Sequence, residues 1–474
     1  MQTRSEGFLG YGSGGSSVCA FAELFTCVTW NGGTLFTWIP RFHRCAGLSL
    51  ALQLTLLWFG GPWLSRWCLR NFAASAGTEP SFVSGRSITQ DWTATKKISM
   101  PIKSRNSNNR SVGQLLIIGF DAMEVSPGLR SLLKQVQPAG VILFARNIKT
   151  PEQTWRLLRE CQSCVQAALF ACVDLEGGTV DRLRDALGPA PAAADVFAVD
   201  DPRLYRKHGQ IIGENCRALG FNVDFAPVLD LAFETSRSVM GSRVVSVEPQ
   251  ATVAYARDFL SGLKAANVLG CGKHFPGLGE GQLDSHHELP VIEKSLKAMW
   301  AEDLLPYRLL RRELPFVMIS HAAYPQVTKT TTPASLSKLW ITDILNKKIG
   351  YRGLVASDDL EMGAVLSAAS VGEAAVEFVG AGGDLCLVCH RQDRVLEAHE
   401  ALTKAAEADK KFARRLAESA GRVLAFKKKW GKRLRPVKAP SPVVVEKLTR
   451  RLWEFGEQVR LGPWSRLEDR RRRR

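Results

Sequence analysis

The chain has 474 residues, of which 45% are hydrophobic and 23% are charged, which is typical of a folded globular protein and excludes wholesale disorder. Its net charge of +17 is concentrated at the two ends, because residues 100–426 are nearly balanced in charge. A nucleic-acid groove needs basic residues on the folded body, so we expect no nucleic-acid partner.

The first 110 residues differ in composition from the rest of the chain. Residues 1–99 contain six of the twelve Trp residues but only four acidic residues. An apolar run at residues 46–64 is just long enough for a membrane span, although a Gly-Gly-Pro sequence interrupts it. Met100 begins a stretch that leads directly into the first apolar run of the body. We therefore expect residues 1–110 to be a non-homologous extension that is not part of the natural protein, with membrane contact through residues 46–64 as the less favoured alternative.

From Ser111 onward, eight short apolar runs rich in β-forming residues alternate with helix-like stretches. The predicted strands are 113–121, 140–144, 169–176, 221–230, 269–277, 315–325, 353–360 and 383–389. The clearest predicted helices are 151–167, 202–219, 250–266, 293–311, 335–348 and 363–380. The first of these helices has a marked start, because Thr150 precedes Pro151.

This alternation predicts parallel strands covered by helices, which is the α/β class. Eight units in about 300 residues fit a (β/α)₈ TIM-type barrel, for which ~250 residues are typical. The competing doubly wound sheet would carry a Gly-rich phosphate loop after its first strand, and none is present here. We expect the barrel at residues 111–430 and a basic helical or disordered tail at residues 431–474.

The eleven cysteines are scattered along the chain. Seven lie in the body, an odd number, which favours a reducing compartment over a disulfide framework. Two Cys-x-x-Cys pairs, Cys161 with Cys164 and Cys386 with Cys389, resemble zinc ligands. The first pair falls in a predicted helix and the second in a predicted strand, so we interpret them as small buried side chains and expect no metal.

Polar residues follow the apolar part of most predicted strands, at the end where barrel enzymes place their sites. Burying an unpaired carboxylate is costly, so their convergence favours a polar pocket over a plain ring of ion pairs. These residues are Asp121, Asp174, Glu176, Asp230, Lys273, His274, His321, Asp358 and Asp359.

The loop after the fifth strand, residues 273–290, is the most informative segment. Its three glycines predict mobility. Asp284 and His286 are two residues apart, so the carboxylate can accept the imidazole N–H in a turn. A histidine oriented in this way can donate a proton to a leaving group and later take one from water.

Two further segments suggest carboxylate chemistry. At the seventh strand, Asp358 and Asp359 are neighbours, so only one should face the barrel axis, and spacing alone does not choose between them. The other carboxylate can cap the turn that follows. At the third strand, Asp174 precedes a Gly-Gly pair, with Arg182 beyond it.

Taken together, these segments resemble glycoside hydrolase family 3, specifically its single-domain β-N-acetylglucosaminidases. The string KHFPGLGEGQLDSH at residues 273–286 is similar to the family pattern K-H-F-P-G-x-G-x(4)-D-S-H. VDLEGGTVDR at 173–182, FAPVLDL at 225–231, GVILFARNI at 140–148 and SDDLEMGA at 357–364 match other family segments in the same order. The resemblance extends from about Val112 to about Lys429.

The resemblance implies roles for individual residues. Asp358 corresponds to the nucleophile that forms a glycosyl-enzyme intermediate, and His286 to the general acid/base with Asp284 as its partner. The residues that correspond to those gripping the terminal sugar are Asp174, Arg182, Arg243, Lys273 and His274. Around Arg243 the sequence departs from the family, because Val244 and Val245 replace the usual Ser or Ala and Phe.

The implied activity is exo-acting, retaining hydrolysis of terminal β-linked N-acetylglucosamine, with no cofactor and no metal. The implied substrate is a carbohydrate, a muropeptide from peptidoglycan or a chitooligosaccharide, and the implied location is the cytoplasm, or a membrane anchor if residues 46–64 span a bilayer. Two alternatives within the family are a β-glycoside phosphorylase and a β-glucosidase. A remote alternative is a Schiff-base aldolase that uses Lys273.

Overall fold

The computed structural model describes Phe25–Trp30, Gly33–Trp38 and residues 111–472, apart from Gln282, Asp284, His286 and His287; side chains are described from Ser111 to Gly462. The chain divides into two units, Met1–Ile98 and Ser99–Arg474. In the first unit, β1 (Phe25–Trp30) and β2 (Gly33–Trp38) pair as an antiparallel hairpin. The apolar run at residues 46–64 lies outside the described residues.

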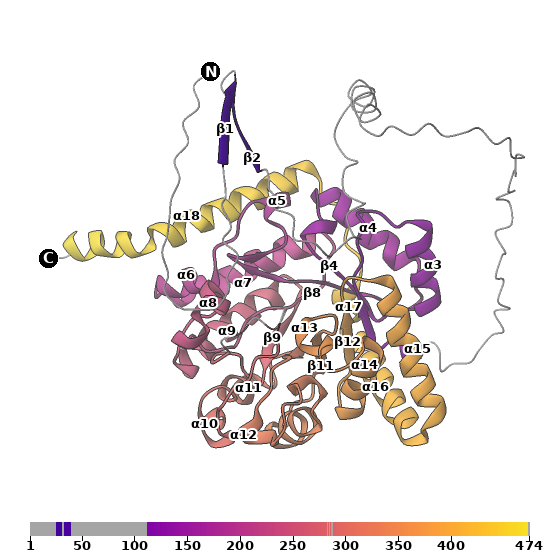
Figure 1. Cartoon of the computed structure of the whole chain (residues 1–474). Helices are drawn as coiled ribbons and strands as arrows, with labels where there is room; N and C mark the ends of the chain where they lie inside the picture. The colour runs from indigo at the N-terminus through magenta and orange to yellow at the C-terminus, as the bar shows by residue number, and fades with distance from the viewer. Residues whose placement is uncertain are drawn as a thin grey trace, which may run out of the picture. The chain divides into compact units, whose positions relative to one another are not determined.

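Eight parallel strands of the second unit close into a barrel, which confirms the predicted fold class (Figure 1). The barrel closes where Cys386 of the last strand pairs with Leu116 of the first. Each strand falls within a run predicted from the sequence, and most are shorter than that run. In order around the barrel the strands are β3 (Leu116–Ile118), β4 (Gly140–Leu143), β5 (Phe170–Val173), β8 (Val223–Asp224), β9 (Leu269–Phe275), β10 (Phe316–Ile319), β11 (Leu354–Asp359) and β12 (Leu385–Val388).

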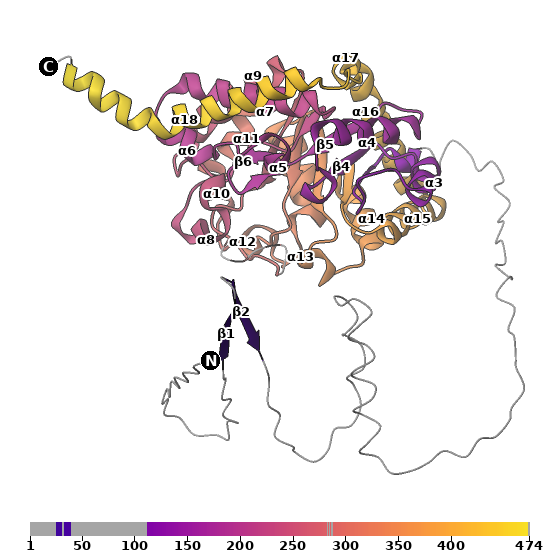
Figure 2. The same cartoon turned by 90° about the horizontal axis from the view of Figure 1, so that it is seen from above.

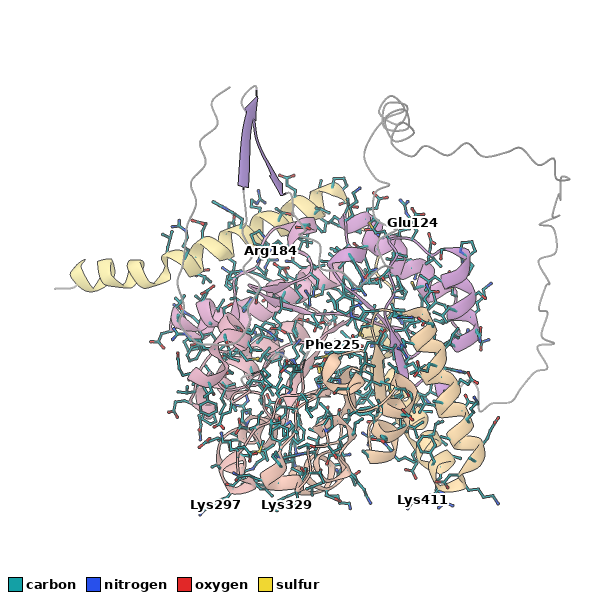
Figure 3. The ribbon with its side chains drawn as sticks, viewed as in Figure 1. Glu124, Arg184, Phe225, Lys297, Lys329 and Lys411 are labelled. Carbon is teal, nitrogen blue, oxygen red and sulfur yellow. The ribbon has the colours of Figure 1, made fainter. Side chains whose placement is uncertain are left out.

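Aromatic side chains fill the interior of the barrel. The rings of Phe170 and Phe316 meet edge to face with centroids 5.3 Å apart, and Phe426 packs against both. Phe225 lies in the middle of the fold, whereas Lys297, Lys329 and Lys411 lie at its edge (Figure 3). The barrel is therefore a packed core rather than a pore, as its near-continuous apolar strands require.

Helices connect the strands and cover the barrel from outside (Figures 1 and 2). The predicted helix start at Pro151 is confirmed, because the Thr150 hydroxyl accepts the N–H of Gln153 at 3.2 Å. The helices are α3 (Pro127–Val136), α4 (Pro151–Ser163), α5 (Arg184–Leu187), α6 (Ala193–Ala198), α7 (Pro202–Ala218), α8 (Arg237–Met240), α9 (Pro249–Ala265), α10 (Leu296–Ala301), α11 (Leu305–Leu310), α12 (Pro325–Thr328), α13 (Gly363–Leu366), α14 (Val371–Ala381), α15 (Gln392–Ala408), α16 (Lys410–Lys429), α17 (Gly431–Leu434) and α18 (Pro442–Arg472).

Three predicted helices differ in detail from the structure. The stretch 293–311 was expected to be one helix, but it forms α10 and α11 with a break between them. The stretch 363–380 likewise forms α13 and α14, because Ser370 starts a new helix with a capping box to Glu373. The stretch 335–348 forms the short helix η4 (Ala334–Leu336) and the π-helix η5 (Leu339–Ile349).

The chain beyond the barrel packs against it. The long helix α18 lies along α7, with contacts to α5 and α6 (Figures 1 and 2). Phe455 of α18 is fully buried and its ring lies 5.6 Å from that of His208. Before α18, the indole N–H of Trp155 donates to the carbonyl of Val437 at 3.0 Å. The segment after residue 430 therefore contributes apolar core as well as positive charge.

The seven cysteines of the barrel unit are buried and free, and burial raises the pKa of Cys161 to about 12. Cys386 and Cys389 belong to two different clusters of apolar side chains, so strand alternation separates them. Within the described part of the chain, no group of three or more His, Cys, Asp or Glu side chains has the arrangement of a metal site. No helix among the described residues is long and apolar enough to cross a membrane.

Candidate active site

A cavity of 260 Å³ lies at the end of the barrel where the carboxyl ends of the strands meet. This is the face at which TIM-barrel enzymes carry their sites. Its volume is close to the lower end of the ~300–1,000 Å³ range of small-molecule pockets, which suits a single ring-sized group. The predicted site residues that line it are Asp174, Arg182, Arg243, Lys273, His274 and Asp358, together with Glu176, Ser285, Asp359 and His390.

Lys273 is the centre of the charged network. It stands on β9, and its ammonium group donates to Asp174 at 2.8 Å and pairs with Glu176 at 2.6 Å. Burial alone would lower the pKa of Lys273, but the two carboxylates outweigh that effect and raise its pKa above the ordinary value. Lys273 is therefore held as a cation beneath the cavity.

Glu176 joins Lys273 to Arg243. It follows β5 on the short strand β6 (Leu175–Gly177), which pairs with β7 (Val180–Asp181) in a small hairpin. The Arg243 guanidinium donates two parallel hydrogen bonds to its carboxylate, at 2.8 and 2.9 Å. Burial raises the pKa of Glu176, but Arg243 and Lys273 outweigh burial and hold the pKa well below its usual range.

His274 is held by Asp230. The Asp230 carboxylate lies 2.7 Å from Nδ1 of His274 and also accepts the backbone N–H groups of His274 and Leu278. A carboxylate that accepts Nδ1–H leaves Nε2 of the ring for the cavity. Asp230, predicted at the mouth, therefore orients a cavity residue rather than lining the cavity itself.

Asp358 and Asp359 have different surroundings although they are neighbours on β11. Asp359 accepts the backbone N–H groups of Glu361 at 3.1 Å and Cys389 at 3.2 Å, and it pairs with His390 at 3.2 Å. It therefore caps the turn after the strand. Asp358 accepts only the backbone N–H of Asp359 and has no hydrogen bond from another described side chain.

The surroundings of Asp358 keep its carboxylate ionised. Burial acts to raise its pKa, but the nearby His274 and His321, the N–H of Asp359 and Lys273 outweigh burial and lower the pKa below the ordinary value. An ionised carboxylate at a cavity, free of side-chain partners among the described residues, can attack an electrophilic carbon.

His321 forms a hydrogen bond with the end of the seventh strand, β11. It is fully buried; its Nε2 lies 3.0 Å from the Asp359 carbonyl and its Nδ1 lies 2.7 Å from the Ser335 hydroxyl. Burial lowers the pKa of His321, and its Nε2–H donates to the Asp359 carbonyl. As predicted, His321 follows the carboxyl end of its strand, β10, but it hydrogen-bonds to the backbone of β11 and does not line the cavity.

Asp284 and His286 lie outside the described residues, and the loop around them is described in part. Ser285, between them in the sequence, lines the cavity, and its carbonyl accepts the N–H of Ala364 at 3.3 Å. Gly277 has φ 137°, and a Cβ there would lie 2.7 Å from Asp303. A Cβ at Gly279 would lie 2.6 Å from the Leu231 carbonyl. These two glycines thus permit close packing, a role that the sequence did not indicate.

Arg182 and Asp121 complete the predicted set. Arg182 lines the cavity, and its Nε is buried with no hydrogen-bond partner among the described residues. Its guanidinium lies 5.7 Å from the Phe144 ring. Asp121 does not join the cavity: its side chain is exposed and pairs with Arg146.

Sequence reasoning missed several residues that line the cavity, among them two aromatic rings. Phe144 and His390 stack with ring centroids 5.6 Å apart at its edge. The hydrogen bond from His390 to Asp359 raises the pKa of His390. Phe144 directly follows β4, and His390 lies two residues after β12, so both stand at strand ends, a signal that a search for carboxylates alone overlooks.

Comparison with known sequences identifies one family model and similar proteins that match the barrel part of the chain. The family described as "Glycosyl hydrolase family 3 N terminal domain" matches residues 108–426. A β-hexosaminidase of Aromatoleum aromaticum is 39% identical over 270 residues, covering 54% of this chain and 74% of the relative. A β-hexosaminidase of Bordetella avium is 37% identical over 262 residues, with the same coverage of 54% and 74%.

Comparison with solved structures agrees with the comparison of sequences. A glycoside hydrolase family 3 β-N-acetylglucosaminidase from Paenibacillus sp. str. FPU-7 matches with a TM-score of 0.69 and 32% identity, covering 74% of this chain and 68% of the other. A β-N-acetylhexosaminidase from Beutenbergia cavernae matches with a TM-score of 0.64 and 26% identity, covering 68% of this chain and 99% of the other.

Proposed function

The chain belongs to glycosyl hydrolase family 3, and from this membership and the geometry of the cavity we propose that the protein hydrolyses terminal β-linked N-acetylglucosamine with retention of configuration. The observation that carries the proposal is Asp358, an ionised carboxylate at the end of β11 that no described side chain neutralises. The names of the similar proteins, β-hexosaminidase and β-N-acetylglucosaminidase, support this choice of sugar.

In the proposed mechanism, Asp358 attacks the anomeric carbon while His286 protonates the leaving oxygen, so the glycosidic bond breaks as the glycosyl–Asp358 bond forms. His286 then takes a proton from water, which attacks the same carbon and releases the sugar. Asp284 is proposed to orient His286. Two observations support the pair: its spacing in the sequence, and the position of Ser285 at the cavity wall.

The remaining predicted residues are proposed to grip the sugar. Asp174 and Lys273 form an ion pair whose outer atoms face the cavity, and His274 presents Nε2 to it. Arg182 has an unsatisfied Nε, and Arg243 uses Nε and Nη2 on Glu176, which leaves Nη1 for a hydroxyl group of the sugar. Polar groups fixed by partners in this way bind hydroxyl groups with little reorganisation.

The aldolase alternative does not fit the surroundings of Lys273. A Schiff base forms from a neutral amine, whereas two carboxylates within 2.8 Å raise the pKa of this lysine and keep it protonated. The distinction between a hydrolase and a phosphorylase depends on the acceptor, which is water in the proposal.

As the natural substrate we propose a muropeptide or chitooligosaccharide with a terminal N-acetylglucosamine, handled in the cytoplasm. Support for a reducing compartment comes from the seven buried, free cysteines of the barrel unit, since secreted domains commonly oxidise such residues to disulfides. Incubation with purified muropeptides and with chitobiose, followed by mass spectrometry, would identify which of the two releases N-acetylglucosamine.

The activity is tested with 4-nitrophenyl β-glycosides of N-acetylglucosamine, glucose and xylose, each with and without inorganic phosphate. We expect the N-acetylglucosaminide to be cleaved fastest and free N-acetylglucosamine to be the product in both buffers. Preference for the glucoside, or a sugar 1-phosphate as the main product, would contradict the proposal.

The roles of the residues are tested with two variants. Asp358→Asn should lose roughly 10⁴-fold or more in kcat while it remains folded, because the nucleophile is removed. His286→Ala should lose ~10²–10⁴-fold with a poor leaving group and much less with 2,4-dinitrophenol, which needs no proton. Equal losses with both leaving groups would argue against an acid role for His286.

A further inference from the structure

A second, larger cavity lies at the other end of the barrel from the candidate active site. Its volume is 820 Å³, and it shares no lining residue with the first cavity. It is formed by the segments that enter strands β9, β10 and β11, together with the end of α16 and with α17. In a barrel of parallel strands these segments lie at the face opposite the carboxyl ends of the strands.

The walls of this cavity are strongly basic. Seven lysine and arginine side chains line it, against two carboxylates: Arg257, Lys264, Arg311, Arg312, Arg352, Lys429 and Arg433 against Asp258 and Glu313. Five of the seven belong to residues 100–426, which are nearly neutral overall, whereas Lys429 and Arg433 belong to the basic segment that follows; the fold thus adds two charges of that segment to five of the body. Positive groups lining a concave surface raise the local concentration of anions.

Most of this charge has no partner within the described protein. The Arg257 guanidinium pairs with Glu313, with atoms 3.1 Å apart, which occupies one of the two carboxylates. Arg311 donates to the backbone carbonyl of Arg308, and Arg352 donates to that of Asn346. Arg257–Glu313 is the ion pair between lining residues of this cavity, and Lys264, Arg312, Lys429 and Arg433 form none with any side chain that the structure describes.

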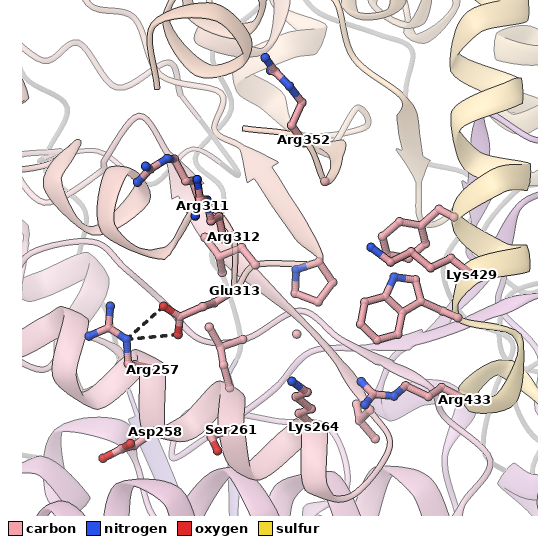
Figure 4. Close-up of a pocket in the computed structure, with 18 of the residues that line it drawn as sticks. Arg257, Asp258, Ser261, Lys264, Arg311, Arg312, Glu313, Arg352, Lys429 and Arg433 are labelled. Atoms are coloured by element: carbon pink, nitrogen blue, oxygen red, sulfur yellow. Dashed lines mark hydrogen bonds and ion pairs between the residues drawn. The ribbon is translucent and has the colours of Figure 1, made fainter. Parts of the chain in front are cut away.

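Three of these cations point toward one space. Lys264 comes from α9, Lys429 from α16 and Arg433 from α17, and their head groups extend toward the middle of the cavity (Figure 4). These helices are far apart in the sequence, so the fold brings the three charges together. Like charges that converge repel one another, and a bound anion would relieve that repulsion.

An aromatic side chain adds a further unsatisfied donor. Trp430 lines the cavity, and its indole Nε1 is buried without an acceptor among the described residues. The Arg433 guanidinium lies 4.7 Å from its ring centroid, and burial lowers the pKa of Arg433. A buried N–H without an acceptor is costly, and one acceptor oxygen of an occupant would satisfy it.

We propose that this cavity binds a small anion with two linked phosphate groups, either free diphosphate or the diphosphate of a nucleotide. Lys264, Lys429 and Arg433 would contact the phosphate oxygens, with the Trp430 N–H as a further donor. The volume lies within the ~300–1,000 Å³ range of small-molecule sites. The rings of Phe426 and Trp430, next to the cations, suit a planar base.

The test is isothermal titration calorimetry of the full chain with inorganic pyrophosphate and, separately, with ADP, at an ionic strength held constant with NaCl. We expect saturable binding of one ligand per chain. Lys264→Gln and Arg433→Gln should each weaken binding by roughly tenfold or more, since each removes a charge-assisted hydrogen bond. Lys411→Gln, an exposed lysine at the start of α16, is the matched control and should bind as the wild type does.

Each outcome has a defined meaning. If ADP binds more tightly than pyrophosphate, the adenine base also contacts the protein, as expected for the rings of Phe426 and Trp430. If the two affinities are equal, the diphosphate alone is recognised. Both outcomes support the proposal. All three variants should keep the wild-type rate with the N-acetylglucosaminide, because none of these lysine or arginine residues touches the first cavity. Absence of binding at matched ionic strength, or unchanged affinity in both cavity variants, would overturn the proposal.

Discussion

The carboxylate of Glu176 accepts two parallel hydrogen bonds from the guanidinium of Arg243, at 2.8 and 2.9 Å. The pair connects the hairpin after β5 to the segment after β8, and the same carboxylate also pairs with Lys273. The position of Lys273 at the base of the cavity therefore depends on a residue that does not itself react.

Replacing Arg243 by Lys tests this dependence, because Lys keeps the charge but cannot form two parallel bonds. A hydrogen bond to a charged group contributes ~1.5–3 kcal/mol, so kcat/KM should fall by roughly 10- to 100-fold. Arg237→Lys is the matched control: it lies on α8 nearby and its ion pair with Glu234 is exposed. A fall of the same size in both variants would mean that the bidentate pair has no special role.

The variant Asp359→Asn tests whether Asp359 stabilises the fold and Asp358 carries the catalytic activity. Asp359 accepts two backbone N–H groups and pairs with His390, so the variant should lose ~1–3 kcal/mol of unfolding free energy. It should retain far more activity than Asp358→Asn, because Asp358 keeps its charge. Urea denaturation and steady-state kinetics on both variants give the comparison, and complete inactivity of folded Asp359→Asn would contradict it.

The lowered pKa of Lys427 should make the free energy of unfolding depend on pH. It is buried at the base of the barrel, donates to Gln114 at 2.8 Å, and burial lowers its pKa to about 7. Because the pKa in the folded state is below that of the unfolded chain, ~10.4, protonation opposes folding, and stability should increase as pH rises from about 7 to about 10.

The measurement is the difference in unfolding free energy between the wild type and Lys427→Met at pH 7, 8, 9 and 10. The wild type should gain up to ~1.4 kcal/mol per pH unit relative to the variant over this range. Taking the difference cancels the other groups that titrate there. A difference that does not change with pH would show that Lys427 has its ordinary pKa.

Phe455 and Trp453 offer a matched test of whether α18 belongs to the folded domain. Phe455 is fully buried, whereas the Trp453 side chain is 65% exposed. Phe455→Ala should cost ~3–5 kcal/mol, and Trp453→Ala should change stability by less than ~0.5 kcal/mol. Equal small effects in urea denaturation would mean that α18 docks only weakly.

Removal of the first 99 residues should leave the activity intact. Residues Ser99–Arg474 form one unit by their own contacts and contain every residue of the candidate site. A chain that begins at Met100 should therefore show the kcat/KM of the full chain with the N-acetylglucosaminide. Loss of activity in a soluble, folded product would assign a role to the N-terminal segment.

The sequence by itself determined the barrel and the family. Alternating apolar runs and helix-like stretches are local patterns, and they located all eight strands because a buried parallel strand must be apolar along its length. The carboxylates at strand ends likewise pointed to the cavity. Their spacing left Asp358 and Asp359 open, and the family resemblance implied Asp358 as the nucleophile.

Only the tertiary structure decided which partner each polar group has. It distinguished Asp359, which accepts the N–H groups of Glu361 and Cys389, from Asp358. It also showed that His321 hydrogen-bonds to the Asp359 carbonyl and does not line the cavity. It also brought Lys264, Lys429 and Arg433 to one space. Such pairings join residues far apart in the chain, and closure of the barrel sets their distances, so no local pattern encodes them.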